Sequence, residues 1–297
     1  MDQMVDRYPS RILPTPTIVD RLDPIVWGES KQDGAPLAPA DIESFKRNGY
    51  LAFARFFTPE EVGRLTAALA AAWHSAGRSD GDMIVREPDS DIVRSVFAIH
   101  ESDAVFRDLL HDPRLAGIAA QLLGSPVYIH QSRINYKTGF RGKEFYWHSD
   151  FETWHTEDGM PRMRAISISI ALSDNHAVNG PLMLIPGSHK HYVTCVGATP
   201  EDHFRESLRR QAIGTPDDGS LRWLVEQGGI DAPTGPAGSI VLFDCNTMHG
   251  SNGNITPYPR SNIFAVYNSV ENALVQPFGG TPPRPDFIAS RKVTPIA

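Results

Sequence analysis

Residues 165–172 alternate between large aliphatic and small side chains, and this pattern constrains the fold more than any other in the chain. Isoleucines at 166, 168 and 170 alternate with serines at 167 and 169. Successive side chains of a β-strand point to opposite faces, so a period of two predicts a strand. Turns rich in glycine and proline separate this segment from other predicted strands. The predicted strands cover 127–136, 165–172, 181–185, 239–244 and 262–270.

The chain before residue 124 has helical patterns instead. Thr58 is followed by Pro59 and, three residues after Thr58, by a glutamate. This spacing is a capping box with proline at the first helical position. Asp41 is expected to cap a short helix, and Asp112 precedes another. The expected ends of these helices are Gly49, Gly77 and Gly124.

These patterns divide the chain into an arm and one domain. Residues 1–38 contain prolines at 9, 14, 16, 24 and 36 and are expected to form an extended N-terminal arm. A single domain is expected over 39–297, with a helical front part at about 39–124 and a β core at about 125–297. Residues 199–229 are read as a helical insert in that core. A mainly β fold with flanking helices, either a jelly roll or a barrel, follows from this order.

Composition excludes several classes of protein. A net charge of −7 offers no general attraction for a polyanion, so no nucleic-acid partner is expected. No apolar run reaches the roughly 18–20 residues that span a bilayer. The N-terminal sequence lacks the basic start and apolar stretch of a secretory signal, so a cytoplasmic location is expected. Cys195 and Cys245 form neither a disulfide framework nor a zinc site, so metal chemistry would need histidine and carboxylate.

A candidate metal site begins at His148 and Asp150, which lie two residues apart. On a strand both side chains would leave the same face. His249 is the best third ligand, because it ends an apolar strand and enters a turn rich in glycine and asparagine. Two histidines and one carboxylate suit non-haem Fe(II) oxygen chemistry, whereas zinc more often takes three histidines, or two and a glutamate. His155 is a rival ligand, although its odd separation from His148 points it to the other face of a regular strand.

Arg260 lies 11 residues after His249, beyond a segment of glycine, asparagine and proline that should turn the chain back. It would then start the next strand beside the metal. A fixed guanidinium there can bind the distal carboxylate of 2-oxoglutarate through two parallel hydrogen bonds.

Residues 147–155, with the sequence WHSDFETWH, and 157–161, with EDGMP, resemble the signature segment of the ectoine hydroxylases. These enzymes belong to the phytanoyl-CoA dioxygenase-like superfamily, which residues 180–189 (GPLMLIPGSH) also resemble. The likeness extends from about residue 40 to about residue 290.

The resemblance implies a double-stranded β-helix, a cupin-like jelly roll. It also implies that Fe(II), 2-oxoglutarate and O₂ are used to hydroxylate ectoine at ring carbon 5, with release of succinate and CO₂, and that the chain forms a homodimer. Iron would be bound by His148, Asp150 and His249. The 2-oxoglutarate site would comprise Arg260, Asn135, Ser251 and Arg133. The ectoine site would comprise Gln131, Thr153, Trp154, Asn262, Phe264 and Arg284.

The chemistry of ectoine is compatible with these residues. An aromatic face such as Trp154 attracts the cationic ring, and Arg284 could pair with the carboxylate. Arg284 lies in a proline-rich tail at 281–285, which would either be solvated or close over the substrate as a lid.

Three other functions remain open. A related dioxygenase could act on another small amino-acid-like substrate such as proline. A cupin-like protein could bind ligand or metal without turnover. A zinc hydrolase is a third alternative, and the lack of an HExxH motif argues only against one common protease type.

Overall fold

The computed structural model describes residues 5–28, 34–88, 90–200, 202–209 and 211–296. Two pieces of the expected arm, residues 1–4 and 29–33, lie outside these ranges, as do Glu201 and Arg210 in the expected helical insert. No helix in the described part of the chain is long and apolar enough to cross a membrane.

Helices and strands alternate along the chain, with most helices in the first half. The α-helices are α1 (Pro39–Asn48), α2 (Pro59–Ala76), α3 (Ile99–Ser102), α4 (Ala104–Leu110), α5 (Pro113–Leu123), α6 (Asp150–Thr153), α7 (Phe204–Ser207) and α8 (Asp218–Gly228). A π-helical turn, Trp154–Asp158, continues α6, and short 3₁₀ turns occupy Ser188–Lys190 and Val270–Asn272. The strands are β1 (Ile18–Asp20), β2 (Tyr50–Phe53), β3 (Ile84–Arg86), β4 (Val93–Phe97), β5 (Val127–Lys137), β6 (Phe145–His148), β7 (Ala165–Ala171), β8 (Leu182–Leu184), β9 (His191–Val193), β10 (Ile240–Asp244), β11 (His249–Ser251) and β12 (Arg260–Ser269).

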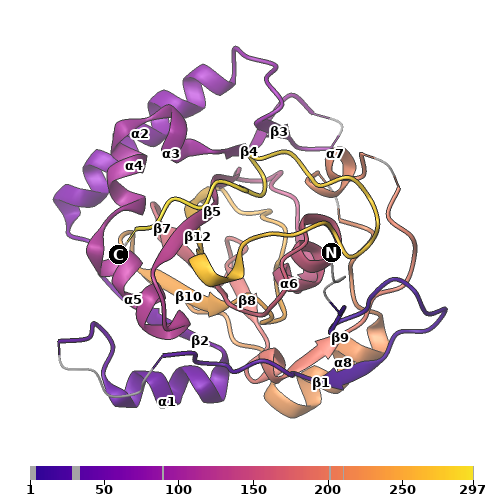
Figure 1. Ribbon diagram of the computed structural model, residues 1–297. Helices are drawn as coiled ribbons and strands as arrows, with labels where there is room; N and C mark the ends of the chain where they lie inside the picture. Colours follow the sequence, from indigo (N-terminus) through magenta and orange to yellow (C-terminus); the bar gives the residue numbers. More distant parts are fainter. Residues whose placement is uncertain (1–4, 29–33, 89, 201, 210, 297) are drawn as a thin grey trace.

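The described strands form a large sheet, a small sheet and a two-stranded ribbon of β1 and β9, all antiparallel. The large sheet has the order β2-β10-β7-β12-β5-β4-β3, and the small sheet has the order β6-β11-β8. Leu182 and Leu184 of β8 pack with Phe243 of β10 and Phe264 of β12, so the small sheet covers one face of the large one. Helices α1, α2, α4 and α5 lie along the outside of the large sheet (Figure 1). This arrangement confirms the expected mainly β fold with flanking helices.

The alternation in β7 separates two environments. Ile166, Ile168 and Ile170 are fully buried and belong to the core shared by the large sheet and the helices. Ser167 and Ser169 point to the opposite face and are buried too. The serine face of β7 therefore faces the interior between the two sheets.

The helix ends follow the sequence signals with one exception. The Thr58 hydroxyl accepts a hydrogen bond from the Glu61 N–H at 3.3 Å, and the Glu61 carboxylate accepts one from the Thr58 N–H at 2.7 Å. Asp41, however, does not occupy the cap position of α1. Ala38 does, and the Asp41 carboxylate, three residues later, accepts a hydrogen bond from the Ala38 N–H at 3.1 Å.

The front part is less purely helical than expected, because β2, β3 and β4 join the large sheet there. These strands have three to five residues each, which is too short for a period of two to stand out. Among the described residues of 199–229, the expected helical pattern is realised as α7 and α8, and residues 211–216 between them are irregular.

The N-terminal arm is packed against the domain. Its residues Ile18–Asp20 form β1, which pairs with β9, and Figure 1 shows the arm running past β9 and α8. Tyr8 is almost fully buried and packs edge-on against Phe151 and Tyr192. The arm is thus part of the wall behind α6.

Candidate metal centre and its surroundings

The three candidate ligands come from three different elements. His148 ends β6 and His249 begins β11, and the register of these strands places the two histidines opposite each other. Asp150 is the first residue of α6. The expectation that His148 and Asp150 lie on one strand is wrong, because β6 ends at His148 and Asp150 begins α6. Ser149 between them nevertheless has an extended backbone (φ −102°, ψ 129°), so the alternation of side chains continues past the strand end and the carboxylate converges with His148.

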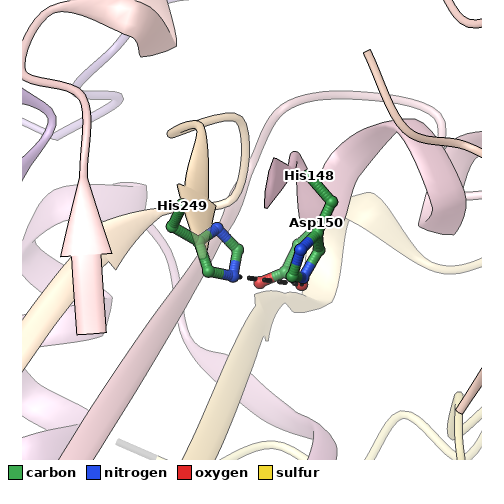
Figure 2. Close-up of side chains that lie close together, drawn as sticks. All are labelled: His148, Asp150 and His249. Carbon is green, nitrogen blue, oxygen red and sulfur yellow. Dashed lines mark ion pairs between the residues drawn. The ribbon is translucent and has the colours of Figure 1, made fainter. Parts of the chain in front are cut away.

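The three side chains converge on one point (Figure 2). Nε2 of His148 is 3.7 Å from Oδ1 of Asp150, and Nε2 of His249 is 3.9 Å from the same oxygen. One donor atom from each residue lies within 4.8 Å of the other two. Two imidazoles and one carboxylate at this separation could hold a single metal ion.

Neighbouring groups orient these donors. The Nδ1 of His148 is 2.7 Å from the Tyr146 carbonyl oxygen, and the Nδ1 of His249 is 2.9 Å from the Thr247 carbonyl oxygen. A carbonyl oxygen can only accept, so each Nδ1 carries the proton and each Nε2 keeps its lone pair for a metal. The Ser167 hydroxyl donates to Oδ2 of Asp150 at 3.0 Å, which leaves Oδ1 facing the two imidazoles.

The protonation states of these side chains also suit metal binding. Burial, and then the neighbouring His249, lower the pKa of His148 to about 4. Burial alone would raise the pKa of Asp150, but His249, His148 and Arg133 outweigh that effect and lower it. A neutral imidazole and an ionised carboxylate are the forms that bind metal. The donor set therefore fits a 2-His-1-carboxylate iron site.

A second feature of the site is a pair of buried cations. Arg260 begins β12 and lies opposite Lys137, the last residue of β5. Nε and Nη1 of Arg260 are buried and have no hydrogen-bond partner among the described residues. Burial lowers the pKa of Arg260 to about 10, and burial together with the charge of Arg260 lowers the pKa of Lys137 to about 6. Two buried cations with donors to spare fit a dicarboxylate such as 2-oxoglutarate.

The other residues expected at the 2-oxoglutarate site lie around this pair. The Ser251 hydroxyl accepts a hydrogen bond from Nζ of Lys137 at 2.9 Å. Asn135 is two residues before Lys137 in β5, and its Oδ1 accepts from the Ser95 hydroxyl at 2.7 Å. Asn135 and Arg133 line a cavity of about 420 Å³ that reaches His148. The structure therefore brings all four expected residues to the side of the barrel that holds the histidines.

The residues expected to bind ectoine surround a smaller cavity beside the first. Gln131, Thr153, Trp154 and Arg284 line it together with His148 and Asp150. Its remaining wall is formed by Arg133, by Glu157 of the π-helical turn, and by Ser207, Leu208, Gln211 and Ile213. Two of the three expected metal ligands and four of the six expected ectoine residues thus line one cavity.

Asn262 and Phe264 lie deeper, on β12. Nδ2 of Asn262 donates to the Ser169 hydroxyl at 2.8 Å, while Oδ1 of Asn262 is buried without a partner in the described chain. The guanidinium carbon of Arg133 lies 5.0 Å from the centre of the Phe264 ring. These two residues do not line the smaller cavity, and they border the site from the large sheet.

Arg284 is neither solvated nor free. It is largely buried, and Nε and Nη2 donate to the two carboxylate oxygens of Asp158 at 2.8 and 2.6 Å. Glu157 lies 3.8 Å from Nε of Arg284. The guanidinium is therefore fixed at the cavity wall by a buried carboxylate, and the proline-rich tail is folded against the domain.

His155 does not join the metal ligands. Its Nδ1 is 2.8 Å from the Met160 carbonyl oxygen and its Nε2 is 2.8 Å from Asp6. The ring stacks on Phe278 with a centroid distance of 4.0 Å. The rival ligand thus has a separate role, in packing the π-helical turn against the arm and the C-terminal tail.

Sequence reasoning missed Lys137 and Glu157. Lys137 could have been found, because Gln131, Arg133 and Asn135 already mark one face of a predicted strand at a period of two, and Lys137 is the next residue on that face. Glu157 has no such strand pattern, although it begins the EDGMP segment at 157–161. It reaches the cavity only because a π-helical turn follows α6.

A jelly roll that brings two imidazoles and one carboxylate together is typical of non-haem iron oxygenases. The family model of the phytanoyl-CoA dioxygenases (PhyH) matches residues 45–262, and the chain belongs to this family. Among its relatives, the ectoine dioxygenase of Stutzerimonas stutzeri is 55% identical over 287 residues, which are 97% of this chain and 95% of that protein. The ectoine dioxygenase of Bordetella bronchiseptica is 52% identical over 97% of this chain and 93% of its own.

A solved structure is similar over almost the whole chain. The crystal structure of EctD from S. alaskensis with 2-oxoglutarate and 5-hydroxyectoine has a TM-score of 0.89 and 49% sequence identity. The match covers 98% of this chain and 96% of that one. The resemblance predicted from residues 147–161 and 180–189 is confirmed by these comparisons.

Proposed function

We propose that this protein is an Fe(II)- and 2-oxoglutarate-dependent dioxygenase that hydroxylates ectoine to 5-hydroxyectoine, with release of succinate and CO₂. The observation that carries the proposal is the convergence of His148, Asp150 and His249 beside the unpaired donors of Arg260. This constellation occurs in a chain that is 48–55% identical to several ectoine dioxygenases. Neither a zinc hydrolase nor a binding protein without turnover is favoured by any feature of the site.

His148, Asp150 and His249 would bind the iron. Three protein ligands on one side leave the opposite positions for other ligands, as oxygen-activating iron requires. Ser167 would keep the Asp150 carboxylate turned toward the metal, and the carbonyls of Tyr146 and Thr247 would keep each Nε2 directed inward.

Arg260 and Lys137 would hold the distal carboxylate of 2-oxoglutarate. Arg260 offers two unpaired nitrogens in a fixed fork, which suits bidentate binding of a carboxylate. Ser251 and Asn135 would add hydrogen bonds, and Arg133 would supply positive charge between this carboxylate and the iron. Burial of these groups makes each charge-assisted hydrogen bond stronger than it would be in water.

The smaller cavity would receive ectoine. Trp154 would face the cationic ring, and Phe264 would limit the space toward the large sheet. Gln131, Thr153 and Asn262 would provide directional hydrogen bonds. Asp158 would fix Arg284 so that the part of its guanidinium outside the Asp158 fork faces the ectoine carboxylate.

When bound, iron and 2-oxoglutarate supply the oxygen-activating chemistry, in which the co-substrate is decarboxylated to succinate. The protein's own residues bind and orient the reactants. Trp154 and Phe264 are almost fully buried, so they exclude water from the space beside the ligands. Fixed positions for both substrates reduce the entropic cost of bringing the target C–H bond to the metal.

Three further expectations remain proposals. Residues 39–297 would act as one catalytic domain with the arm as an accessory. The protein would work in the cytoplasm, and it would assemble as a homodimer. Size-exclusion chromatography with light scattering would test the last of these.

The test of the function is anaerobic reconstitution with Fe(II) and 2-oxoglutarate, followed by O₂ and ectoine, with products measured by mass spectrometry. We expect a product heavier than ectoine by one oxygen atom, formed one-to-one with succinate. Parallel reactions with proline test the nearest alternative substrate. Succinate without hydroxylated ectoine would retain the oxygenase class but reject ectoine as the substrate. No succinate, with iron bound, would favour a binding protein.

A further inference from the structure

Arg11 connects the N-terminal arm to the substrate cavity, although it lies far from the metal ligands in sequence. Its side chain is only 3% exposed. Its backbone has a positive φ of 63°, which a residue with a side chain rarely adopts. Its backbone N–H donates to the Cys195 carbonyl oxygen at 2.9 Å. The strained backbone directs the guanidinium into the domain, and such strain is often kept where a side chain has a function.

The Arg11 guanidinium binds three groups at once. Nε and Nη2 donate to the two oxygens of Glu152 at 3.0 and 2.7 Å, and Nη1 donates to Glu157 at 2.6 Å. Nη1 also lies 2.6 Å from the Thr199 hydroxyl. Burial alone would lower the pKa of Arg11, but Glu152 and Glu157 outweigh that effect and raise it. The Arg11 guanidinium therefore stays charged, and it contacts residues of two walls of the cavity.

The first wall is the turn that carries Trp154. Glu152 precedes Trp154 by two residues, and Glu157 belongs to the π-helical turn that begins at Trp154 and lines the cavity. Glu157 is shared, since Arg11 holds one of its oxygens and Arg284 lies 3.8 Å from the other. Without Arg11, Glu157 would compete with Asp158 for Arg284, which Asp158 now holds.

The second wall is the segment from Thr199 to Thr215. Its residues Ser207, Leu208, Gln211 and Ile213 line the cavity. The segment closes tightly over Arg11 at Gly214, where an added Cβ would collide with Nη2 of Arg11 and come within 2.8 Å of Glu152. Gly214 also has a φ of +74°. Arg11 is thus enclosed between the turn that carries Trp154 and the 199–215 segment.

We propose that Arg11 is a positioning residue for ectoine, which sets the distance between the Trp154 turn and the 199–215 segment and keeps Glu157 from drawing Arg284 away from the cavity. This inference rests on the proposed function. Arg11 does not line the cavity itself, so it would act only through Glu152, Glu157 and Thr199.

The expected kinetic effect of replacing Arg11 is selective for ectoine. Replacing Arg11 should raise the KM for ectoine and leave the KM for 2-oxoglutarate unchanged, because the side-chain partners of Arg11 are Glu152, Glu157 and Thr199, whereas those of Lys137 are Ser251 and Asn252. Breaking one side of a buried ion pair leaves an uncompensated charge. We therefore expect the ectoine KM of R11Q to rise by about tenfold or more.

Three variants and one control separate this role from simple stability. R11K retains the charge but cannot make the fork, so its ectoine KM should lie between those of wild type and R11Q. T199V removes only the hydrogen bond to the 199–215 segment and should raise the ectoine KM by a few-fold. The control is R7Q, since Arg7 belongs to the same arm and its contacts, Asp23 and Leu22, remain within the arm. R7Q should match wild type.

A second readout does not depend on turnover. Arg205 lies on α7 with 58% of its side chain exposed and is a site for trypsin. If Arg11 holds the 199–215 segment, trypsin should cleave after Arg205 faster in R11Q and T199V than in R7Q or wild type.

Equal increases in both KM values, or an unchanged ectoine KM in R11K and T199V, would overturn the proposal. If R11Q fails to fold, R11K and T199V decide by the same criteria. If the wild-type protein does not hydroxylate ectoine, the proposed function fails, and the trypsin comparison alone then tests whether Arg11 holds the segment.

Discussion

Arg260 and Lys137 are directly opposite each other in the β12–β5 ladder, so two basic side chains are buried side by side. Like charges in such positions repel each other. Nothing in the described chain pairs with Nε or Nη1 of Arg260. Nζ of Lys137 donates to the Ser251 hydroxyl and the Asn252 carbonyl oxygen and lies 5.4 Å from the centre of the Phe145 ring, so no carboxylate of the described chain pairs with it directly. The pair is therefore arranged for an anion that the chain itself does not provide.

Replacing Arg260 should selectively weaken 2-oxoglutarate binding. Loss of a bidentate, charge-assisted contact costs about 3 kcal/mol, so the KM for 2-oxoglutarate in R260Q should rise roughly 100-fold. R260K should recover only part of this, because an ammonium cannot bind both oxygens in a fixed fork. Steady-state kinetics with each substrate varied in turn provide the measurement. An ectoine KM that rises as much as the 2-oxoglutarate KM would contradict the assignment.

The affinity for 2-oxoglutarate should depend on pH through Lys137. Its pKa is lowered to about 6, first by burial and then by Arg260. Above pH 6 the free protein therefore holds Lys137 neutral, whereas a bound carboxylate favours the ammonium. Binding then takes up a proton, and the 2-oxoglutarate KM should rise with pH above about 6, by at most tenfold per unit.

K137M removes the titrating group and serves as the control for this pH dependence. Its 2-oxoglutarate KM should be higher than that of wild type near pH 6 and should vary less with pH. A wild-type KM that is constant between pH 6 and pH 8 would show that Lys137 does not change protonation on binding.

The ligand assignment can be tested by metal content alone. D150A and H249A should lose bound iron after anaerobic loading and desalting, because each lacks one of the three donors that lie within 4.8 Å. H155Q should retain stoichiometric iron, since His155 is bonded to Met160 and Asp6 instead. The iron content of each variant is measured by mass spectrometry of the metal. Iron lost in H155Q but kept in H249A would replace His249 with His155 in the ligand set.

The parts of the site that could be predicted from sequence are those on regular strands. The period of two in β7 predicted the strand, and the same period links Gln131, Arg133 and Asn135 on β5. It did not predict that the serine face of β7 would also be buried. That burial results from the small sheet packing on the large one, a contact between segments far apart in the chain.

The parts that could not be predicted depend on irregular chain and distant partners. Glu157 reaches the cavity only through the π-helical turn that follows α6. Arg284 lies in a proline-rich segment that looks solvated, yet it is buried because Asp158, 126 residues earlier, offers a matching carboxylate. No local pattern encodes such a pair.

Gly159 should be essential to the turn that carries Trp154 and Glu157. It ends this turn with a φ of +82°, and an added Cβ would collide with the Val275 carbonyl oxygen. G159A should therefore lower the free energy of unfolding by more than about 1 kcal/mol. It should also raise the ectoine KM, because Val275 would have to move away from the turn.

The matched control for this glycine is G63A. Gly63 is an exposed glycine within α2, and an added Cβ meets nothing within 4 Å. Alanine has a higher helix propensity than glycine, so G63A should raise the free energy of unfolding by about 0.5–1 kcal/mol and leave both KM values unchanged. Urea denaturation of the two variants measures the difference. If G159A were as stable as wild type, the backbone at Gly159 could not be what shapes the cavity, and the π-helical turn would have to be held by the Arg11 and Arg284 ion pairs alone.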